Sequence, residues 1–243
     1  MKLVQLNVWW GGKLDNSIKQ LLETEVADIL CLQEAASSTL KDAGPFLTIE
    51  SMQKLGYSYK EFAPEFSLKF MRNDISFGNA ILSNLPIKFS SAIYTNLEHV
   101  EDFDFSLHDY NIRNVLHCVY EISGKRLNVL THHGHHVHEH KNGNEDTLRQ
   151  MEQIVDYVKG LEGEVILTGD FNLAPNSKSL QLLNNVLDNL AIKYGLETTR
   201  NSLTTKDEVC DYIFVSSGVN VESFIASEEL VSDHMALILD FSI

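Results

Sequence analysis

Two polar residues follow a short apolar run in the last third of the chain. Residues 165–167 predict a buried strand, Gly169 permits a tight turn, and Asp170 and Asn172 come next. Side chains two residues apart in an extended chain point the same way, so a carboxylate and a carboxamide would stand side by side. A carboxylate there could accept a proton or bind a hard metal ion, although an isolated pair of this kind is more often a simple turn.

Other strand-like segments end in polar residues that could meet this pair. The predicted strand 2–8 carries Asn7 near its end, and the apolar segment 28–34 ends in Glu34. An amphipathic helix separates them, and such a crossover would bring both side chains to one edge of a sheet. The complete set of polar residues at predicted strand ends is Asn7, Glu34, His132, Asp170, Asn172, Asp211, Asp233 and His234.

This set, in this order, resembles the endonuclease/exonuclease/phosphatase superfamily with the DNase I-like fold. The resemblance extends from residue 7 to residue 234, and each of its segments is weak alone but strong in combination. The matching segments are Leu32-Gln33-Glu34, Phe77-Gly78-Asn79-Ala80-Ile81-Leu82-Ser83, Thr131-His132, Gly169-Asp170-Phe171-Asn172, Asp211-Tyr212 and Ser232-Asp233-His234.

The resemblance implies a divalent-metal-dependent hydrolase that attacks a phosphate ester directly with water. Glu34 would bind Mg²⁺ or Mn²⁺, and Asn7 and Asp233 would complete or orient the metal shell. Asp170 would orient and deprotonate the attacking water, and Asn172 would position that water or the phosphate.

The same resemblance gives two histidines the task of donating to the non-bridging phosphate oxygens. These are His132 and His234, and Asp211 would fix the tautomer of His234 and keep its ring protonated. His133 follows directly, but Thr131 and the alternation of the strand favour His132. Some members use a further acid for the leaving group, for which Tyr94, Asp109 and Tyr110 are candidates.

The pattern of elements predicts an α/β fold. About ten strands and at least four helices would form two packed mixed β-sheets flanked by helices, a four-layer α/β sandwich. No linker divides the chain, so residues 1–243 are expected to form one domain. Residues 63–73 are expected as an exposed aromatic loop, 96–111 as an acidic surface loop, and 177–194 as helical.

Charge limits the class of substrate. Lys and Arg number 19 against 34 Asp and Glu, which gives a net charge of −15 without any basic run. Duplex nucleic acid and anionic membranes are therefore disfavoured, and a small phosphorylated molecule or an accessible phosphodiester is expected. A metal-dependent nuclease and a non-catalytic member that binds a phosphorylated ligand remain the alternatives. The sequence does not indicate an oligomeric state.

Two further features concern the compartment and a second metal. Three cysteines in apolar runs indicate buried thiols in a reducing compartment, and no signal peptide or membrane-length segment is visible, so a cytoplasmic location without membrane insertion is expected. Residues 132–140 hold six of the ten histidines. A transition-metal site is one interpretation of this His-rich segment, and a polar loop is the favoured one.

Overall fold

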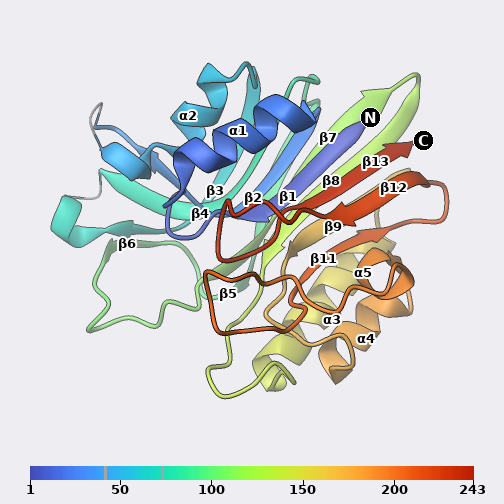
Figure 1. The fold of residues 1–243 in the computed structure, drawn as a ribbon. Coiled ribbons are helices and arrows are strands. Elements are labelled where there is room, and N and C mark those ends of the chain that lie inside the picture. Colours follow the sequence, from blue (N-terminus) through green and yellow to red (C-terminus); the bar gives the residue numbers. More distant parts are fainter. Residues whose placement is uncertain (41–42, 73) are drawn as a thin grey trace.

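The computed structural model describes residues 1–40, 43–72 and 74–243. Two mixed β-sheets pack face to face, and helices cover their outer faces (Figure 1). The seven-stranded sheet has the order β12-β13-β1-β2-β4-β3-β6, and the six-stranded sheet has the order β10-β11-β9-β8-β7-β5. The predicted four-layer α/β sandwich is confirmed.

The strands of the larger sheet are β1 (Lys2–Asn7), β2 (Ile29–Ser38), β3 (Tyr59–Leu68), β4 (Ile75–Ser83), β6 (Val100–Phe103), β12 (Asn220–Ala226) and β13 (Leu237–Ser242). Those of the smaller sheet are β5 (Phe89–Asn96), β7 (Arg113–Ile122), β8 (Lys125–His133), β9 (Glu164–Asp170), β10 (Asp188–Asn189) and β11 (Asp211–Val215). The helices are α1 (Asp15–Glu25), α2 (Thr48–Lys54), α3 (Glu145–Lys159), α4 (Lys178–Asn184) and α5 (Leu190–Lys193), with 3₁₀ turns η1 (Gly44–Phe46) and η2 (Lys69–Met71).

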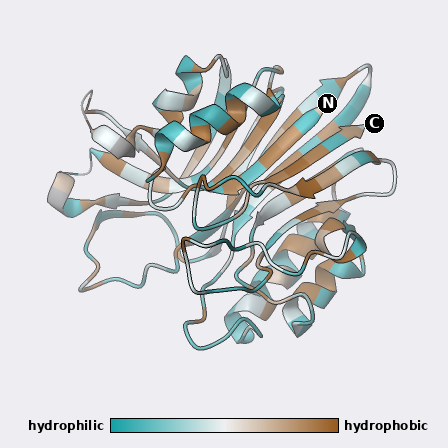
Figure 2. Cartoon of the chain, viewed as in Figure 1, coloured by the Kyte–Doolittle hydropathy of each residue, from teal (hydrophilic) through white to brown (hydrophobic). Residues whose placement is uncertain are grey.

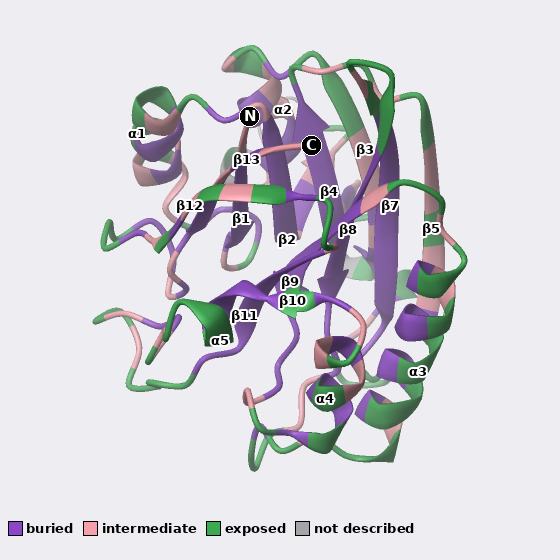
Figure 3. Cartoon of the chain, turned by 90° about the vertical axis from the view of Figure 1, so that its right-hand side faces the viewer, coloured by how far each residue is buried: buried purple, intermediate pink, exposed green. Residues whose placement is uncertain are grey.

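Apolar side chains fill the three spaces between these layers. Leu3 and Cys31 of the larger sheet meet Val129 of the smaller sheet in the central core. Ile18 of α1 belongs to the cluster under the larger sheet, and Met151 of α3 belongs to the cluster under the smaller one. Figure 2 shows the apolar stretches along the central strands, and Figure 3 shows α3 with its buried side toward the sheet. Burial of these faces is the main force that holds the layers together.

Several predicted boundaries were wrong. The expected loop 63–73 is β3 up to Leu68, followed by η2, and Asn73 lies outside the described residues. Its aromatic residues pack in pairs across strands, as Phe66 does on Phe77, which explains why the aromatic content is high in a strand. The acidic segment 96–111 includes β6, and segment 177–194 is split between α4, β10 and α5.

The described residues show two further properties. All three cysteines are buried and unpaired, as the sequence predicted. No described helix is both long enough and apolar enough to span a membrane.

Strand register brings the polar strand ends together. Parallel pairing sets Asn7 of β1 beside Gln33 of β2, and His133 of β8 beside Asp170 of β9. Antiparallel pairing sets Asp211 of β11 on the other side of Asp170. A buried hydrogen bond of 2.8 Å from Gln33 Nε2 to Thr131 Oγ1 then joins the two sheets next to this edge. These strand ends therefore form one site.

Candidate active site

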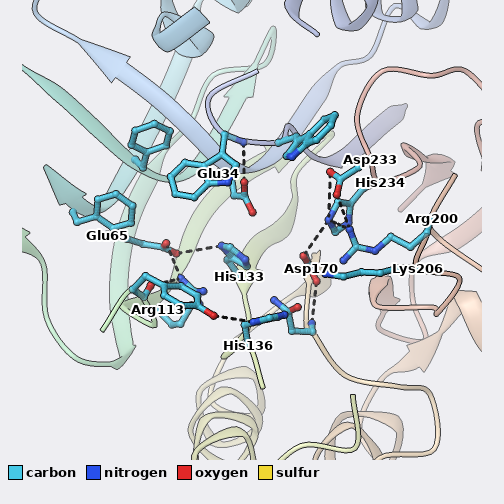
Figure 4. Close-up of a pocket in the computed structure, with 16 residues that line it drawn as sticks. Glu34, Glu65, Arg113, His133, His136, Asp170, Arg200, Lys206, Asp233 and His234 are labelled. Carbon is cyan, nitrogen blue, oxygen red and sulfur yellow. Dashed lines mark hydrogen bonds and ion pairs between the residues drawn. The ribbon is translucent and has the colours of Figure 1, made fainter. Parts of the chain in front are cut away.

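A cavity of about 290 Å³ opens where the ends of both sheets meet. Figure 4 shows Glu34 and Glu65 on one side of it and Asp170, Asp233 and His234 on the other. Most of the predicted site residues line the cavity or lie directly behind its wall. The cavity is near the lower end of the size range of small-molecule sites.

Glu34 reaches the cavity because β2 is interrupted at this point. The pairing of β2 with β4 shifts between Leu32 and Ala35, and Glu34 adopts a left-handed backbone conformation with φ of 55°. Such a bulge turns a side chain away from the regular alternation of a strand. The carboxylate accepts one N–H on each oxygen, 2.8 Å from Trp10 N and 3.1 Å from Asn7 Nδ2.

Asp170 is buried at the end of β9 and stays ionised. It accepts hydrogen bonds from Asn172 N at 3.0 Å and Asn7 Nδ2 at 3.2 Å. Burial alone would raise the pKa of its carboxyl, but the positive charges of His234 and Arg200 hold this pKa well below its ordinary value. Asn7 bridges the carboxylates of Glu34 and Asp170 through its amide nitrogen, so here it orients both acids.

His234 carries positive charge at neutral pH because two carboxylates face it. Its Nδ1 lies 2.8 Å from Asp211 Oδ2, and its Nε2 lies 3.6 Å from Asp170 Oδ2. Burial lowers the pKa of the ring, but these two acids raise it well above its usual 6.5. Asp211 is fully buried behind the cavity, where it also accepts a hydrogen bond from Thr199 Oγ1 and holds the ring of His234 from behind.

Asp233 stands at the rim beside His234. Ser232 Oγ donates to the carbonyl oxygen of Asn7 at 2.7 Å and so fixes this turn to the end of β1. Arg200 Nη1 lies 3.3 Å from Asp233 Oδ2 and contacts His234 Nε2. Asp233 faces the cavity from the turn before β13, and Glu34 faces the same cavity from the bulge in β2.

The preference for His132 over His133 does not match the positions in the structure. His133 lines the cavity, whereas His132 is fully buried and its Nδ1 donates to the carbonyl oxygen of Asn114 at 3.0 Å. Successive strand residues point to opposite faces of the sheet, so only one of these two adjacent rings can enter the cavity. Burial and the neighbouring Arg113 lower the pKa of His133 well below 6.5, so its ring is neutral.

Sequence reasoning missed a buried contact between two titratable side chains that forms one wall. Arg113 Nη1 lies 3.0 Å from Glu65 Oε2, and both side chains are almost completely buried. Burial raises the pKa of Glu65 to about 8, although Arg113 opposes this shift. Glu65 Oε1 lies 3.8 Å from His133 Nδ1. A buried acid within an apolar aromatic strand was the only signal in the sequence.

Positive side chains gather at the cavity despite the acidic composition. Arg113, Arg200 and Lys206 line it, and Lys141 Nζ donates to the Oδ1 atom of Asn172. The sequence predicted no basic run, and the cavity instead gathers single basic residues from separate parts of the chain. These residues come from two loops and one strand end, so no basic run marks them in the sequence.

The His-rich segment is divided between the cavity and the surface. His136 lines the cavity, and Tyr110 Oη lies 2.9 Å from both His136 Nδ1 and His138 Nε2. Of the three candidate leaving-group acids, Tyr110 lines the cavity, whereas Tyr94 donates to a backbone carbonyl and Asp109 accepts from a backbone N–H. No group of three metal-ligand side chains forms within 135–140 in the described structure.

Side chains at two places in the site have the chemistry to hold a metal ion. Ligand atoms of Asp170, Cys210, Asp211 and His234 lie within 4.8 Å of one another. Within this group, His234 Nδ1 and the Cys210 thiol already donate to Asp211. Glu34 instead offers carboxylate oxygens that each accept a single N–H and so retain acceptor capacity toward a hard cation.

Comparisons with known proteins identify the family of the chain. A model of the Endonuclease/Exonuclease/phosphatase family matches residues 4–234. The chain belongs to this family. Family members are generally phosphoesterases that act by hydrolysis, typically with a divalent metal. A search of curated proteins found no match.

Solved structures of the endonuclease/exonuclease/phosphatase family share the fold. A family protein from Leptotrichia buccalis is 16% identical, with a TM-score of 0.74 and 100% of both chains covered. The human Nocturnin catalytic domain with bound sulfate is 18% identical, with a TM-score of 0.70, covering 100% of this chain and 93% of that one. A mannosyl-6-phosphatase from Bacteroides thetaiotaomicron is 16% identical, with a TM-score of 0.67 and 100% of both chains covered.

Proposed function

We propose that this protein is a Mg²⁺- or Mn²⁺-dependent hydrolase that cleaves the phosphate ester of a small molecule by direct attack of water. The observation that carries the proposal is the convergence of Glu34, Asp170 and Asp233 on one cavity with the protonated ring of His234. Carboxylates alone would repel a phosphate, and cationic side chains alone could not accept a proton from water. The combination suits both tasks.

Each residue has a separate task. Glu34 and Asp233 would hold the cation, which neutralises phosphate charge and stabilises the departing oxygen. Asp170 accepts a hydrogen bond from the attacking water, and its two N–H neighbours fix the direction of its lone pairs. Because its pKa is low, Asp170 orients the water in the ground state and takes the proton late, as the P–O bond forms.

Two cations oppose the charge that develops on the phosphate. His234 donates from Nε2 while Asp211 holds the other ring nitrogen. Arg200 provides a fixed guanidinium beside it. His133 replaces His132 in the proposal because it lines the cavity, and Glu65 is positioned to fix its ring.

The small cavity supports a small substrate in preference to duplex DNA. Its volume of about 290 Å³ is suited to a small molecule, and the whole chain carries a net charge of −15. The nuclease alternative draws support from Arg113, Arg200 and Lys206, which could contact a single phosphodiester.

A hydrolysis screen tests the proposal. Chelator-treated protein is given Mg²⁺ or Mn²⁺ and a panel of nucleotides, sugar phosphates, inositol phosphates, headgroup esters, oligonucleotides and plasmid DNA. We expect turnover of at least one small ester. Efficient plasmid nicking without turnover of any small ester would support the nuclease instead. Binding of an ester without turnover under all conditions would support a non-catalytic member.

A further inference from the structure

One wall of the cavity is aromatic, and the proposed hydrolysis makes no use of it. Trp10, Phe66 and Phe77 line this wall, with ring centroids of Trp10 and Phe77 5.5 Å apart. Phe105 extends it outward, 5.7 Å from the ring of Trp10. Trp10 is 47% exposed and Phe105 is 49% exposed. Large aromatic faces left open at a cavity are characteristic of binding surfaces.

The backbone holds Trp10 in place at a conformational cost. Four successive residues, Trp9 to Gly12, have positive φ angles, of which Trp9 has 58° and Trp10 has 50°. Non-glycine residues rarely adopt this conformation, and such strain is concentrated at functional sites. The backbone N–H of Trp10 donates to Glu34 Oε2 at 2.8 Å, so the side chain of Trp10 extends from a point beside the proposed cation ligand.

The polar neighbours of this wall leave few partners for hydroxyl groups. Glu65 is paired with Arg113, and Glu34 is placed to hold the cation. The buried atoms Glu65 Oε1 and His133 Nδ1 have no hydrogen-bond partner. Neither atom is open to a ligand hydroxyl, because both are buried and lie 3.8 Å from each other. A flat ring could stack on the exposed face of Trp10 without hydrogen bonds to these atoms.

We infer that this wall binds a planar aromatic ring carried by the leaving group of the substrate, as in a nucleoside monophosphate. The inference rests on the proposed function, because a phosphate held near Glu34 and Asp170 places the leaving group over Trp10. Trp10 is then the residue that sets specificity, and the aromatic ring is the feature of the substrate that it selects.

A matched pair of ligands tests this inference by binding alone. Adenosine 5′-monophosphate and ribose 5-phosphate share the phosphate and the pentose and differ by the base. Dissociation constants are measured by calorimetry with Mg²⁺ in the Asp170→Asn protein, in which turnover is expected to be slower by about 10²-fold or more. We expect the nucleotide to bind about tenfold tighter, since stacking of one base on an aromatic side chain has about this effect.

Two variants on the same background locate the effect. Trp10→Ala should bring the two dissociation constants close together by weakening only the nucleotide. Tyr59→Ala removes an aromatic ring that is 41% exposed at the far end of β3, and it should keep the full preference.

Several outcomes would overturn the inference. Equal affinity of the Asp170→Asn protein for the two ligands would do so. A preference for the nucleotide that survives in Trp10→Ala would also do so. Equal weakening of both ligands in Trp10→Ala would assign Trp10 to the support of Glu34. Tighter binding of glucose 6-phosphate than of either ligand would assign the wall to a sugar. Absence of hydrolysis in the unmodified protein would count against the proposed function, while the ratio of dissociation constants would still decide the role of the wall.

Discussion

The ring of His234 lies between one acid inside the cavity and one acid behind it. Asp211 fixes Nδ1 at 2.8 Å and contributes to a pKa well above 6.5. The protonated form of His234 is the proposed donor, so activity is lost as the pH rises through this raised pKa. Asp211→Asn removes a negative charge, lowers the pKa of His234 and should move the alkaline limb of the kcat/KM profile to lower pH.

The affinity for Mg²⁺ is the control for Asp211→Asn. Asp211 does not line the cavity, and we expect the metal dissociation constant to stay within about twofold of its original value, because substitutions away from a site have small effects on it. An unchanged pH profile with a weakened metal constant would place Asp211 in the metal shell.

Asp170 and His234 are both expected to act on the transition state. Asp170→Asn and His234→Ala should each lower kcat by about 10²-fold or more, since removal of one preorganised group commonly has this effect. Steady-state kinetics and circular dichroism measure the turnover and the fold. Asp188→Asn, at an exposed position paired with Lys193, is the matched control and should retain activity. Near-normal turnover in both site variants would remove these residues from the mechanism.

At the scale of elements, the loop between β1 and α1 contributes to the stability of the fold and also positions Glu34 in the site. Gly11 has φ of 76°, its N–H donates to the carbonyl oxygen of Glu34, and a Cβ there would lie 3.0 Å from Ala36 Cβ. Gly11→Ala should therefore destabilise the protein by about 2 kcal/mol, from the left-handed backbone and from crowding together. It should also weaken Mg²⁺ binding, because Glu34 shifts with the loop.

Gly195→Ala separates the cost of the left-handed backbone from the cost of crowding. Gly195 has φ of 67° but nothing within 4 Å of its Cβ position, so only the backbone penalty of about 1 kcal/mol applies. Denaturant unfolding and Mg²⁺ titration compare the two variants. If Gly11→Ala were no more destabilising than Gly195→Ala, or left the metal constant unchanged, the loop would not support Glu34.

Strand ends were predictable from the sequence, and the groups between them were not. Asp170 ends an apolar strand, whereas Glu34 ends an apolar run but lies at a bulge of β2, which continues beyond it. The two residues belong to different sheets, and the packing of the sheets brings them to one cavity. The choice between His132 and His133 depends on a register of one residue, which alternation alone did not resolve. Arg200 lies in a loop without periodicity, so only the folded chain brings it to the cavity.

At the scale of the whole molecule, a strongly acidic protein surrounds a site with a mixed set of charges. The net charge of −15 repels a phosphate at long range, while Arg113, Arg200 and Lys206 attract it at short range. A bound divalent cation would add to that attraction and would reverse the local field of Glu34 and Asp233. The proposed chemistry therefore depends on the cation for binding as well as for catalysis.

The most direct test is a titration of chelator-treated protein with Mg²⁺, with hydrolysis of the best ester from the screen as the readout. We predict no turnover in excess chelator and saturable recovery with Mg²⁺. Glu34→Gln should need about tenfold or more Mg²⁺ for half-maximal turnover and then recover in part, because loss of one charged ligand weakens metal binding by this order. Asp170→Asn should not recover at any concentration. Full turnover in excess chelator, with no metal retained in the protein, would contradict the account.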